Sequence, residues 1–448
     1  MFNRDIVDKL KEWASKKDRK PLILRGARQV GKTSAVNIFA KSFDHYIYLN
    51  LDLAEDKQLF ELDSPFKDTV AAIFFSRNKE MNAGRTLLFI DEIQNSPSAV
   101  SKLRYFYENA SNIYVIAAGS LLESLIDKTI SFPVGRVEFL AVRPCNFGEF
   151  LLAIGETESV KILSSYPVPD YAHDKVINLF AKYMLIGGMP EVVKSYAEHR
   201  DLVKLANIYE SLIVSYLDDV EKYSRNPNQT NIIRHIISSA FLYAGERIKF
   251  EGFGKSGYRS KDIGESFRIL EKTMLLQLVY PVTTTTSPIE ANLAKSPKLH
   301  LLDTGLVNYK AKIQGELLKS NKIDNVYQGK IAEHITGQEL MALNQSVLGK
   351  INFWTREDRK TNAEVDFIYQ FRNLVIPIEV KSGASGSLRS LHSFIDKAPH
   401  SFAVRVWSGK AGIEETSTLT KKPFKLISIP FYLIRSLDSI LEYYRVGE

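Results

Sequence analysis

One octapeptide constrains the fold of this chain more than any other feature. Residues 26–33, GARQVGKT, match the pattern G-x-x-x-x-G-K-[S/T] at every specified position, directly after an apolar run and at the start of a helical stretch. In that context glycines let backbone N–H groups approach phosphate oxygens, and the helix N-terminus adds its partial positive charge. The expected phosphate-binding residues are Gly26, Ala27, Arg28, Gln29, Val30, Gly31, Lys32, Thr33 and Ser34.

Two side chains at the end of this loop have specific expected roles. Lys32 would reach the β- and γ-phosphates of a nucleotide, and Thr33 would give its hydroxyl to Mg²⁺. The alternative is a glycine turn that only matches the pattern.

An acidic pair in LLFIDEIQ, residues 87–94, supports the nucleotide interpretation. Four apolar residues in this segment end in Asp91 and Glu92. A buried parallel strand delivers such a carboxylate to the sheet edge where phosphates bind. Asp91 would hold the Mg²⁺ through water, and Glu92 would orient and polarise the attacking water. The alternative is an acid pair at a helix N-terminus.

The surrounding pattern predicts an α/β fold with a parallel sheet. After an amphipathic helix over 1–19, short apolar runs alternate with helical stretches, which is typical of a parallel sheet covered on both faces. The expected strands are 21–24, 46–51, 86–90, 113–118 and 137–142, and the expected helices between them are 32–42, 66–79, 97–110 and 120–128.

The order of these strands narrows the class of nucleotide-binding protein. One predicted strand, 46–51, separates the phosphate-loop strand from the Asp91 strand along the chain. That order, with a second acid beside the Mg²⁺ acid, resembles the additional-strand P-loop ATPases, including the AAA superfamily. The resemblance implies that Ser120 takes the place of the polar sensor of the γ-phosphate. A plain helix cap is the alternative for Ser120.

Three arginines are candidates for an arginine finger, the cation that stabilises charge during phosphoryl transfer. Arg136 and Arg143 flank the last expected strand of the sheet, and Arg28 lies inside the loop. Either Arg136 or Arg143 would act in cis or from a neighbouring subunit of an oligomer. The alternative for each arginine is an ordinary surface or salt-bridging residue.

The middle of the chain changes in character. Residues 172–248 look largely helical, and residues 247–261 carry a net charge of +4. A helix over 261–275 and two strands joined by a polar loop then give the layout of a winged helix. Arg259, Lys261 and Arg268 could meet DNA phosphates, and the alternative is a purely structural module.

An acidic cluster is expected in the last third. Asp366 begins one strand of a predicted hairpin over 364–381, Glu379 and Lys381 end its partner on the same face, and Glu333 lies on a preceding helix. Carboxylates that converge on one face bind Mg²⁺, here Asp366 and Glu379, and a lysine stabilises charge that develops on phosphorus.

This arrangement resembles the PD-(D/E)xK nuclease fold of restriction endonucleases. Glu333, Asp366, Glu379 and Lys381 stand on the family's catalytic positions, although Val365 replaces its proline. The alternatives are a nuclease-like scaffold that does not cut, or a surface salt-bridge hairpin.

Several motifs along the whole chain occur in a recognisable order. The phosphate loop, LLFIDEIQ, AAGS, GGMPE, HLLDTGL and EVDFIY…IEVK resemble the AAA-type ATPases of bacteria and archaea that carry a C-terminal nuclease-like domain of unknown function. The resemblance implies ATP binding and hydrolysis. We predict an ATPase domain over 1–165, a helical and winged-helix-like domain over 166–310, and a small α/β nuclease-like domain over 311–448.

Composition excludes several other classes. The single cysteine, Cys145, rules out an intrachain disulfide and a structural zinc site. No run approaches the ~18 apolar residues of a membrane span, and the start has no signal-peptide core, so a cytoplasmic protein is expected. The net charge of +7 permits nucleic-acid binding without requiring it.

Three functions remain open from the sequence. The first is a Mg²⁺-dependent ATPase. The second adds ATP-regulated cleavage of DNA or another nucleic acid by the C-terminal domain. The third is a nucleotide-binding switch with a non-catalytic C-terminal docking domain.

Overall fold

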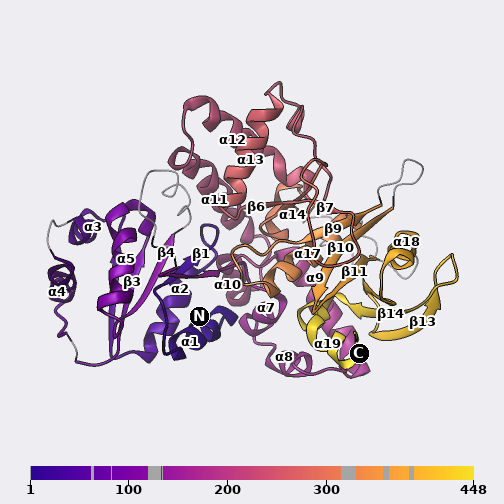
Figure 1. Cartoon of the computed structure of the whole chain (residues 1–448), viewed down its shortest axis with the longest axis horizontal. Helices are drawn as coiled ribbons and strands as arrows, with labels where there is room; N and C mark the ends of the chain where they lie inside the picture. Colours follow the sequence, from indigo (N-terminus) through magenta and orange to yellow (C-terminus); the bar gives the residue numbers. More distant parts are fainter. Residues whose placement is uncertain are drawn as a thin grey trace. The chain divides into compact units, whose positions relative to one another are not determined.

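The computed structural model describes residues 2–61, 65–81, 83–119, 133, 135–313, 329–356, 363–382 and 388–447. These residues form two compact units. The first unit comprises Met1–Arg143 with the short segments Lys272–Met274 and Gln345–Leu348, and the second comprises the remainder. Figure 1 shows the elements of both units along the chain.

The first unit is built on a five-stranded parallel sheet in the order β2-β3-β4-β1-β5. Its strands are β1 (Leu22–Arg25), β2 (His45–Asn50), β3 (Thr86–Asp91), β4 (Tyr114–Gly119) and β5 (Glu138–Ala141). The predicted parallel sheet is therefore confirmed. Although β2 separates β1 from β3 along the chain, β2 lies at the sheet edge, and β4 separates them in space.

The helices of this unit bury one apolar face each. They are α1 (Asp5–Ser15), α2 (Lys32–Phe39), α3 (Ala54–Glu61), α4 (Phe66–Ser76) and α5 (Pro97–Asn109). In α1, Ile6, Leu10 and Trp13 are buried at helical spacing, as the amphipathic pattern predicts. The fully buried β3 explains why its sequence is a continuous apolar run. The predicted helix 120–128 lies outside the described residues.

The second unit opens with helices and confirms the helical prediction for 172–248. The helices are α7 (Phe147–Ala153), α8 (Thr157–Leu163), α9 (His173–Ile186), α10 (Pro190–His199), α11 (Leu205–Asp218), α12 (Pro227–Ala240), α13 (Ser260–Lys272), α14 (Thr304–Lys310), α17 (Gly329–Leu343), α18 (Arg389–Lys397) and α19 (Leu437–Tyr443). Pro190 and Pro227 begin their helices, where a missing N–H costs nothing.

Two sheets complete the second unit. Their strands are β6 (Leu276–Val279), β7 (Pro281–Val282), β8 (Lys298–Leu301), β9 (Asn352–Thr355), β10 (Glu364–Phe371), β11 (Leu374–Val380), β12 (Phe402–Trp407), β13 (Gly412–Ser417) and β14 (Pro423–Pro430). β6 and β8 form an antiparallel pair, and the other seven form a mixed sheet in the order β13-β14-β12-β11-β10-β9-β7. The predicted hairpin over 364–381 is observed as β10 and β11.

The seven-stranded sheet joins strands from two of the predicted domains. β7 comes from the predicted middle domain, yet it pairs with β9 of the predicted last domain, so one sheet crosses the expected boundary at 310. The helix α13 followed by the β6–β8 pair matches the expected layout of the middle segment. The winged-helix assignment and the three-domain division themselves stay predictions.

The described helices contain no candidate for a membrane span. None of them combines the necessary length with sufficient apolarity.

Candidate functional site

The predicted phosphate loop connects β1 to α2. Gly31 is the N-cap of α2 with φ of +90°, a left-handed conformation that favours glycine. A Cβ on Gly26 would lie 2.3 Å from the carbonyl oxygen of Val142, because the chain leaving β5 passes beside β1. Both motif glycines are therefore required by the backbone itself.

The Lys32 side chain lies against the loop. Its ammonium donates hydrogen bonds to the carbonyl oxygens of Gly26 and Ala27, both at 3.0 Å, and the residue is 8% exposed. Burial lowers the pKa of Lys32, while Glu92 and Asp91 act in the opposite direction. The lysine is thus positioned among the loop carbonyls with two carboxylates nearby.

The two predicted magnesium ligands meet at the carboxyl edge of the sheet. The Thr33 hydroxyl donates to Oδ2 of Asp91 at 2.7 Å, and the backbone N–H of Glu92 donates to Oδ1 at 3.1 Å. The Tyr48 hydroxyl from β2 lies 3.4 Å from the same Oδ2. Burial and the Asp91 charge raise the pKa of Tyr48 to about 12, so this phenol stays a donor. A hydroxyl and a carboxylate converging in this way fit a Mg²⁺ site.

Glu92 follows Asp91 in an unusual backbone conformation. Its φ of +51° is left-handed, which is uncommon for a residue with a side chain and recurs at functional sites. The side-chain amide of Gln94 donates a hydrogen bond to the Glu92 carboxylate. Gln94 also approaches the end of β4, since a Cβ on Gly119 would lie 2.3 Å from its Oε1. The sequence analysis did not single out Gln94, although it is only two positions from Glu92.

The structure does not bring Arg136 to the phosphate loop of its own chain. Arg136 precedes β5, whose first residue, Glu138, lies opposite Leu22 at the start of β1, so Arg136 lies at the amino-terminal edge of the sheet. The loop follows the carboxyl end of β1. Arg136 pairs there with Glu108 at 3.3 Å. A role for Arg136 from a neighbouring subunit stays a prediction.

The other predicted finger residues are Arg143 and Arg28, and the predicted sensor is Ser120. Arg143 follows β5 and lies at the same sheet edge as the loop, and burial lowers the pKa of its guanidinium to about 10. Arg28 is exposed. Ser120 lies outside the described residues.

Arg4 holds the loop from a distant part of the sequence. Its guanidinium donates to the carbonyl oxygen of Val30 at 3.2 Å and to that of Arg143 at 2.8 Å. Because 26 positions separate Arg4 from Val30, no local pattern could reveal this contact.

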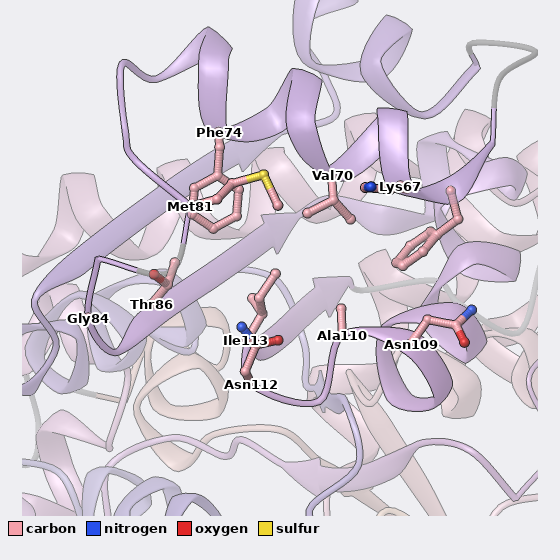
Figure 2. Close-up of a pocket in the computed structure, with 11 residues that line it drawn as sticks. Lys67, Val70, Phe74, Met81, Gly84, Thr86, Asn109, Ala110, Asn112 and Ile113 are labelled. Atoms are coloured by element: carbon pink, nitrogen blue, oxygen red, sulfur yellow. The ribbon is translucent and has the colours of Figure 1, made fainter.

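A cavity of about 440 Å³ lies at the opposite edge of the sheet (Figure 2). Thr86 begins β3, Asn109 ends α5 and Ile113 precedes β4, so the cavity is remote from the loop. Figure 2 shows Phe74 and Met81 among its apolar lining. The sequence analysis did not identify this cavity.

The GGMP and HLLDTG motifs build a buried polar network in the second unit. The carboxylate of Asp303 accepts from the Gly188 N–H at 2.5 Å, and burial raises its pKa to about 6. Oε1 of Gln338 accepts from the Thr304 N–H at 2.8 Å. These motifs therefore serve packing between α9, α14 and α17.

The predicted C-terminal residues converge, as their strands and helix suggest. Oδ2 of Asp366 on β10 accepts from the Val380 N–H at 2.8 Å, and Lys381 pairs with Oε1 of Glu379 at 2.8 Å. Burial raises the pKa of Glu379 to about 8, the Asp366 charge adds to the shift, and Lys381 opposes it. Glu333 on α17 is near enough for its charge to raise the pKa of Glu379 further.

Three further members of this cluster, Lys298, Glu364 and Arg247, were missed by sequence reasoning. Lys298 on β8 forms ion pairs with Glu333 and, at 2.7 Å, with Glu364 on β10. Arg247 pairs with the other oxygen of Glu364 at 2.8 Å. Lys298 precedes Glu333 by 35 positions, so only the tertiary fold reveals the contact.

A divalent metal does not fit this cluster as its side chains lie. Among the residues that the structure describes, no group of three or more His, Cys, Asp or Glu side chains is arranged to hold a metal ion. Glu333 and Glu364 direct their oxygens to Lys298 instead.

Comparison with protein families matches three regions of the chain. Residues 18–151 match a family described as an AAA domain. Residues 177–317 and 328–427 each match a domain of unknown function, DUF8612 and DUF4143 respectively. The first match agrees with the parallel sheet and its loop, so the amino-terminal part of the chain is similar to an AAA-type P-loop domain.

Individual proteins show partial similarity. The replication factor C large subunit of Methanocorpusculum labreanum is 34% identical over 93 residues, which span 20% of this chain and only 18% of that protein. The Walker-type ATPase PABY2304 of Pyrococcus abyssi is 16% identical with a TM-score of 0.44, covering 69% of this chain and 96% of its own. The RuvB Holliday junction branch migration motor of Thermotoga maritima is 16% identical with a TM-score of 0.28, covering 62% and 90%.

Proposed function

We propose that this protein is a Mg²⁺-dependent ATP hydrolase, which binds and hydrolyses ATP at the loop between β1 and α2. The observation that carries the proposal is the 2.7 Å hydrogen bond from Thr33 to Asp91, with Glu92 next in the chain. It joins the end of the phosphate loop to the acidic end of β3, the two places from which such enzymes hold their cation.

The residues of the site have distinct roles in this proposal. Lys32 exchanges the carbonyls of Gly26 and Ala27 for phosphate oxygens when ATP binds. Thr33 and, through water, Asp91 would hold Mg²⁺, which would supply neutralisation of the phosphate charge. Glu92 orients the attacking water and accepts its proton.

Phosphate release by the purified full chain tests this function. We expect turnover of ATP that needs Mg²⁺ and that is lost in Lys32→Ala and Glu92→Gln. Lys41→Ala, an exposed lysine just after α2, is the matched control and should keep full activity. Turnover that persists in both site variants would discard the assignment.

The C-terminal part supports a second, separate proposal about control. Glu333, Asp366 and Glu379 converge, and we propose that this nuclease-like core contacts DNA or another nucleic acid under the control of the nucleotide state. Because a metal does not fit the cluster as it lies, we derive no cleavage step from it. Incubation with DNA and RNA, with Mg²⁺ or Mn²⁺, should reveal any cutting, and cutting that survives in Asp366→Ala would be contamination.

The alternative to this second proposal is a nucleotide-binding switch whose C-terminal part is a non-catalytic docking domain. Tight ATP binding without phosphate release would favour the switch, because binding needs Lys32 but not Glu92.

A further inference from the structure

We propose that Lys298 is the resident cation of the C-terminal acidic cluster, and that the cluster takes up a divalent cation only when the Lys298 ammonium is removed. The cluster comprises Lys298, Glu333, Glu364, Asp366 and Glu379, and its cation binding does not depend on ATP hydrolysis at the amino-terminal loop.

The ammonium occupies the position of a shared ligand. Nζ of Lys298 contacts a carboxylate oxygen of Glu333 and Oε1 of Glu364 at 2.7 Å, while Asp366 is near enough to stabilise its charge further. The side chain is 8% exposed in both ion pairs. A buried ammonium between carboxylates stays charged, and the pKa of Lys298 lies above its usual value because these partners outweigh its burial.

Among the described residues, the cluster also holds a carboxyl oxygen without a hydrogen-bond partner. Oε1 of Glu379 accepts from Lys381, but Oε2 has no hydrogen-bond partner within the described part of the chain, and Glu379 is only 5% exposed. A buried carboxylate oxygen without a partner is costly and is satisfied by a cation. The cluster therefore favours positive charge, and Lys298 supplies one of its cations, held between Glu333 and Glu364.

Charge explains why the ammonium and a divalent ion exclude one another. Lys298, Lys381 and Arg247 supply three positive charges among the four carboxyl groups of Glu333, Glu364, Asp366 and Glu379. Adding a divalent ion would place it against Lys298 in a buried site, where like charges repel strongly. Without Lys298, Glu333 and Glu364 would lose their partner and become free oxygen ligands of the type that Mg²⁺ and Mn²⁺ prefer.

The cation reaches the cluster from another region of the sequence. Lys298 lies within the segment matched by one domain family, residues 177–317, whereas the carboxylates lie within the segment matched by the next, residues 328–427. Within the second unit, the position of β8 therefore decides whether the acidic cluster is closed to metal.

Titration of the full chain with Mn²⁺, without nucleotide, tests the proposal by electron paramagnetic resonance and calorimetry. We expect the Lys298→Gln variant to gain one site that binds Mn²⁺ at least ~10-fold more tightly than any Glu379-dependent site of the wild type. Lys298→Arg keeps the charge and should gain nothing. Lys330→Gln, an exposed lysine paired with Glu246, is the matched control for lysine loss.

A second substitution assigns any gained site to the cluster. The double variant Lys298→Gln/Glu379→Gln should lose the gained binding, since the free Oε2 is then gone. Wild-type protein that already binds Mn²⁺ through Glu379 as tightly as Lys298→Gln would overturn the proposal, as would a folded Lys298→Gln without a new site.

The proposal can also be tested if the Lys298→Gln variant does not fold. Should Lys298→Gln fail to fold, thermal melting of the wild type and of Glu379→Gln with and without Mn²⁺ still distinguishes the outcomes. Equal melting responses of the two proteins support the proposal, and a Mn²⁺ stabilisation that depends on Glu379 overturns it.

Discussion

Single residues around the loop show how the acidic pair is held in position. Asp91 is fixed by hydrogen bonds from Thr33 and from the Glu92 backbone. Glu92 itself is fixed by the Gln94 amide and by a left-handed backbone. A general base works only when its carboxylate is oriented towards the water, so Gln94 is a positioning residue in the proposed reaction.

Gln94→Ala should therefore reduce kcat for ATP by about tenfold while leaving KM nearly unchanged. KM should hold because Gln94 contacts Glu92 rather than the phosphate loop. Steady-state phosphate release measures both constants, and Asn95→Ala, whose amide contacts Asp52 on the surface, is the neighbouring control. A normal kcat in Gln94→Ala would remove Gln94 from the mechanism.

Gly26→Ala should lower both stability and nucleotide affinity. The new methyl group would meet a backbone oxygen 2.3 Å away, so β1 or β5 must shift, at a cost of about 1–3 kcal/mol. Thermal melting and ATP titration measure the two effects. A Cβ on Gly257 would meet no described atom within 4 Å, so Gly257→Ala should behave as wild type. Equal melting temperatures of the two variants would contradict this account.

The sequence could predict the residues of this site that lie in local motifs. The loop glycines, Lys32, Thr33 and Asp91 follow from a short pattern between a strand and a helix. Arg4 and Lys298 could not be predicted, because each contacts its partners across long sequence separations that only the fold closes. The displacement of Arg136 to the far edge likewise follows from the register of β5 against β1.

At the scale of elements, the alternation of apolar runs and helices was enough to predict a parallel sheet, and the 364–381 pattern was enough to predict a hairpin. Strand order was not predictable, because parallel neighbours are chosen by packing rather than by adjacency in the chain. The pairing of β7 with β9 illustrates this, since it joins segments about 70 residues apart.

Elements of the second unit pack around buried acids, which makes its stability depend on pH. On α17, Oε1 of Glu339 accepts from the Tyr183 hydroxyl at 2.7 Å and from the Phe147 N–H at 3.1 Å. Burial raises the pKa of Glu339 from 4.5 to about 7, Glu149 adds to the shift, and Arg435 opposes it. The folded state therefore holds this proton more tightly than the unfolded state, and stability falls as pH rises from about 4.5 through about 7.

Glu339→Gln should flatten this dependence. The amide keeps an oxygen acceptor but cannot ionise, so at pH 8 the variant should melt roughly 2–4 °C above the wild type, while near pH 5 the two should coincide. Melting curves across pH 5–8 measure the difference, with exposed Glu198→Gln on α10 as control. A variant that melts below the wild type at pH 8 would show that the ionised carboxylate is stabilising.

At the scale of the whole molecule, each compact unit contains a hydrophobic core cluster, and the phosphate loop belongs to the first unit. A ligand stabilises the folded state that binds it, by about 2.7 kcal/mol at a concentration one hundred times Kd. Chains with more than one domain commonly depart from two-state unfolding. Scanning calorimetry should accordingly show two transitions, one for each unit. MgATP should raise the transition of the first unit and leave the other where it was.

Lys32→Ala should abolish that shift without moving either transition in the absence of nucleotide by more than a few degrees. Glu339→Gln, in contrast, should move the other transition alone, which assigns each peak to its unit. A single transition that MgATP raises as a whole would mean that the two units unfold together, and no shift at all in the wild type would remove the nucleotide site on which the proposed function rests.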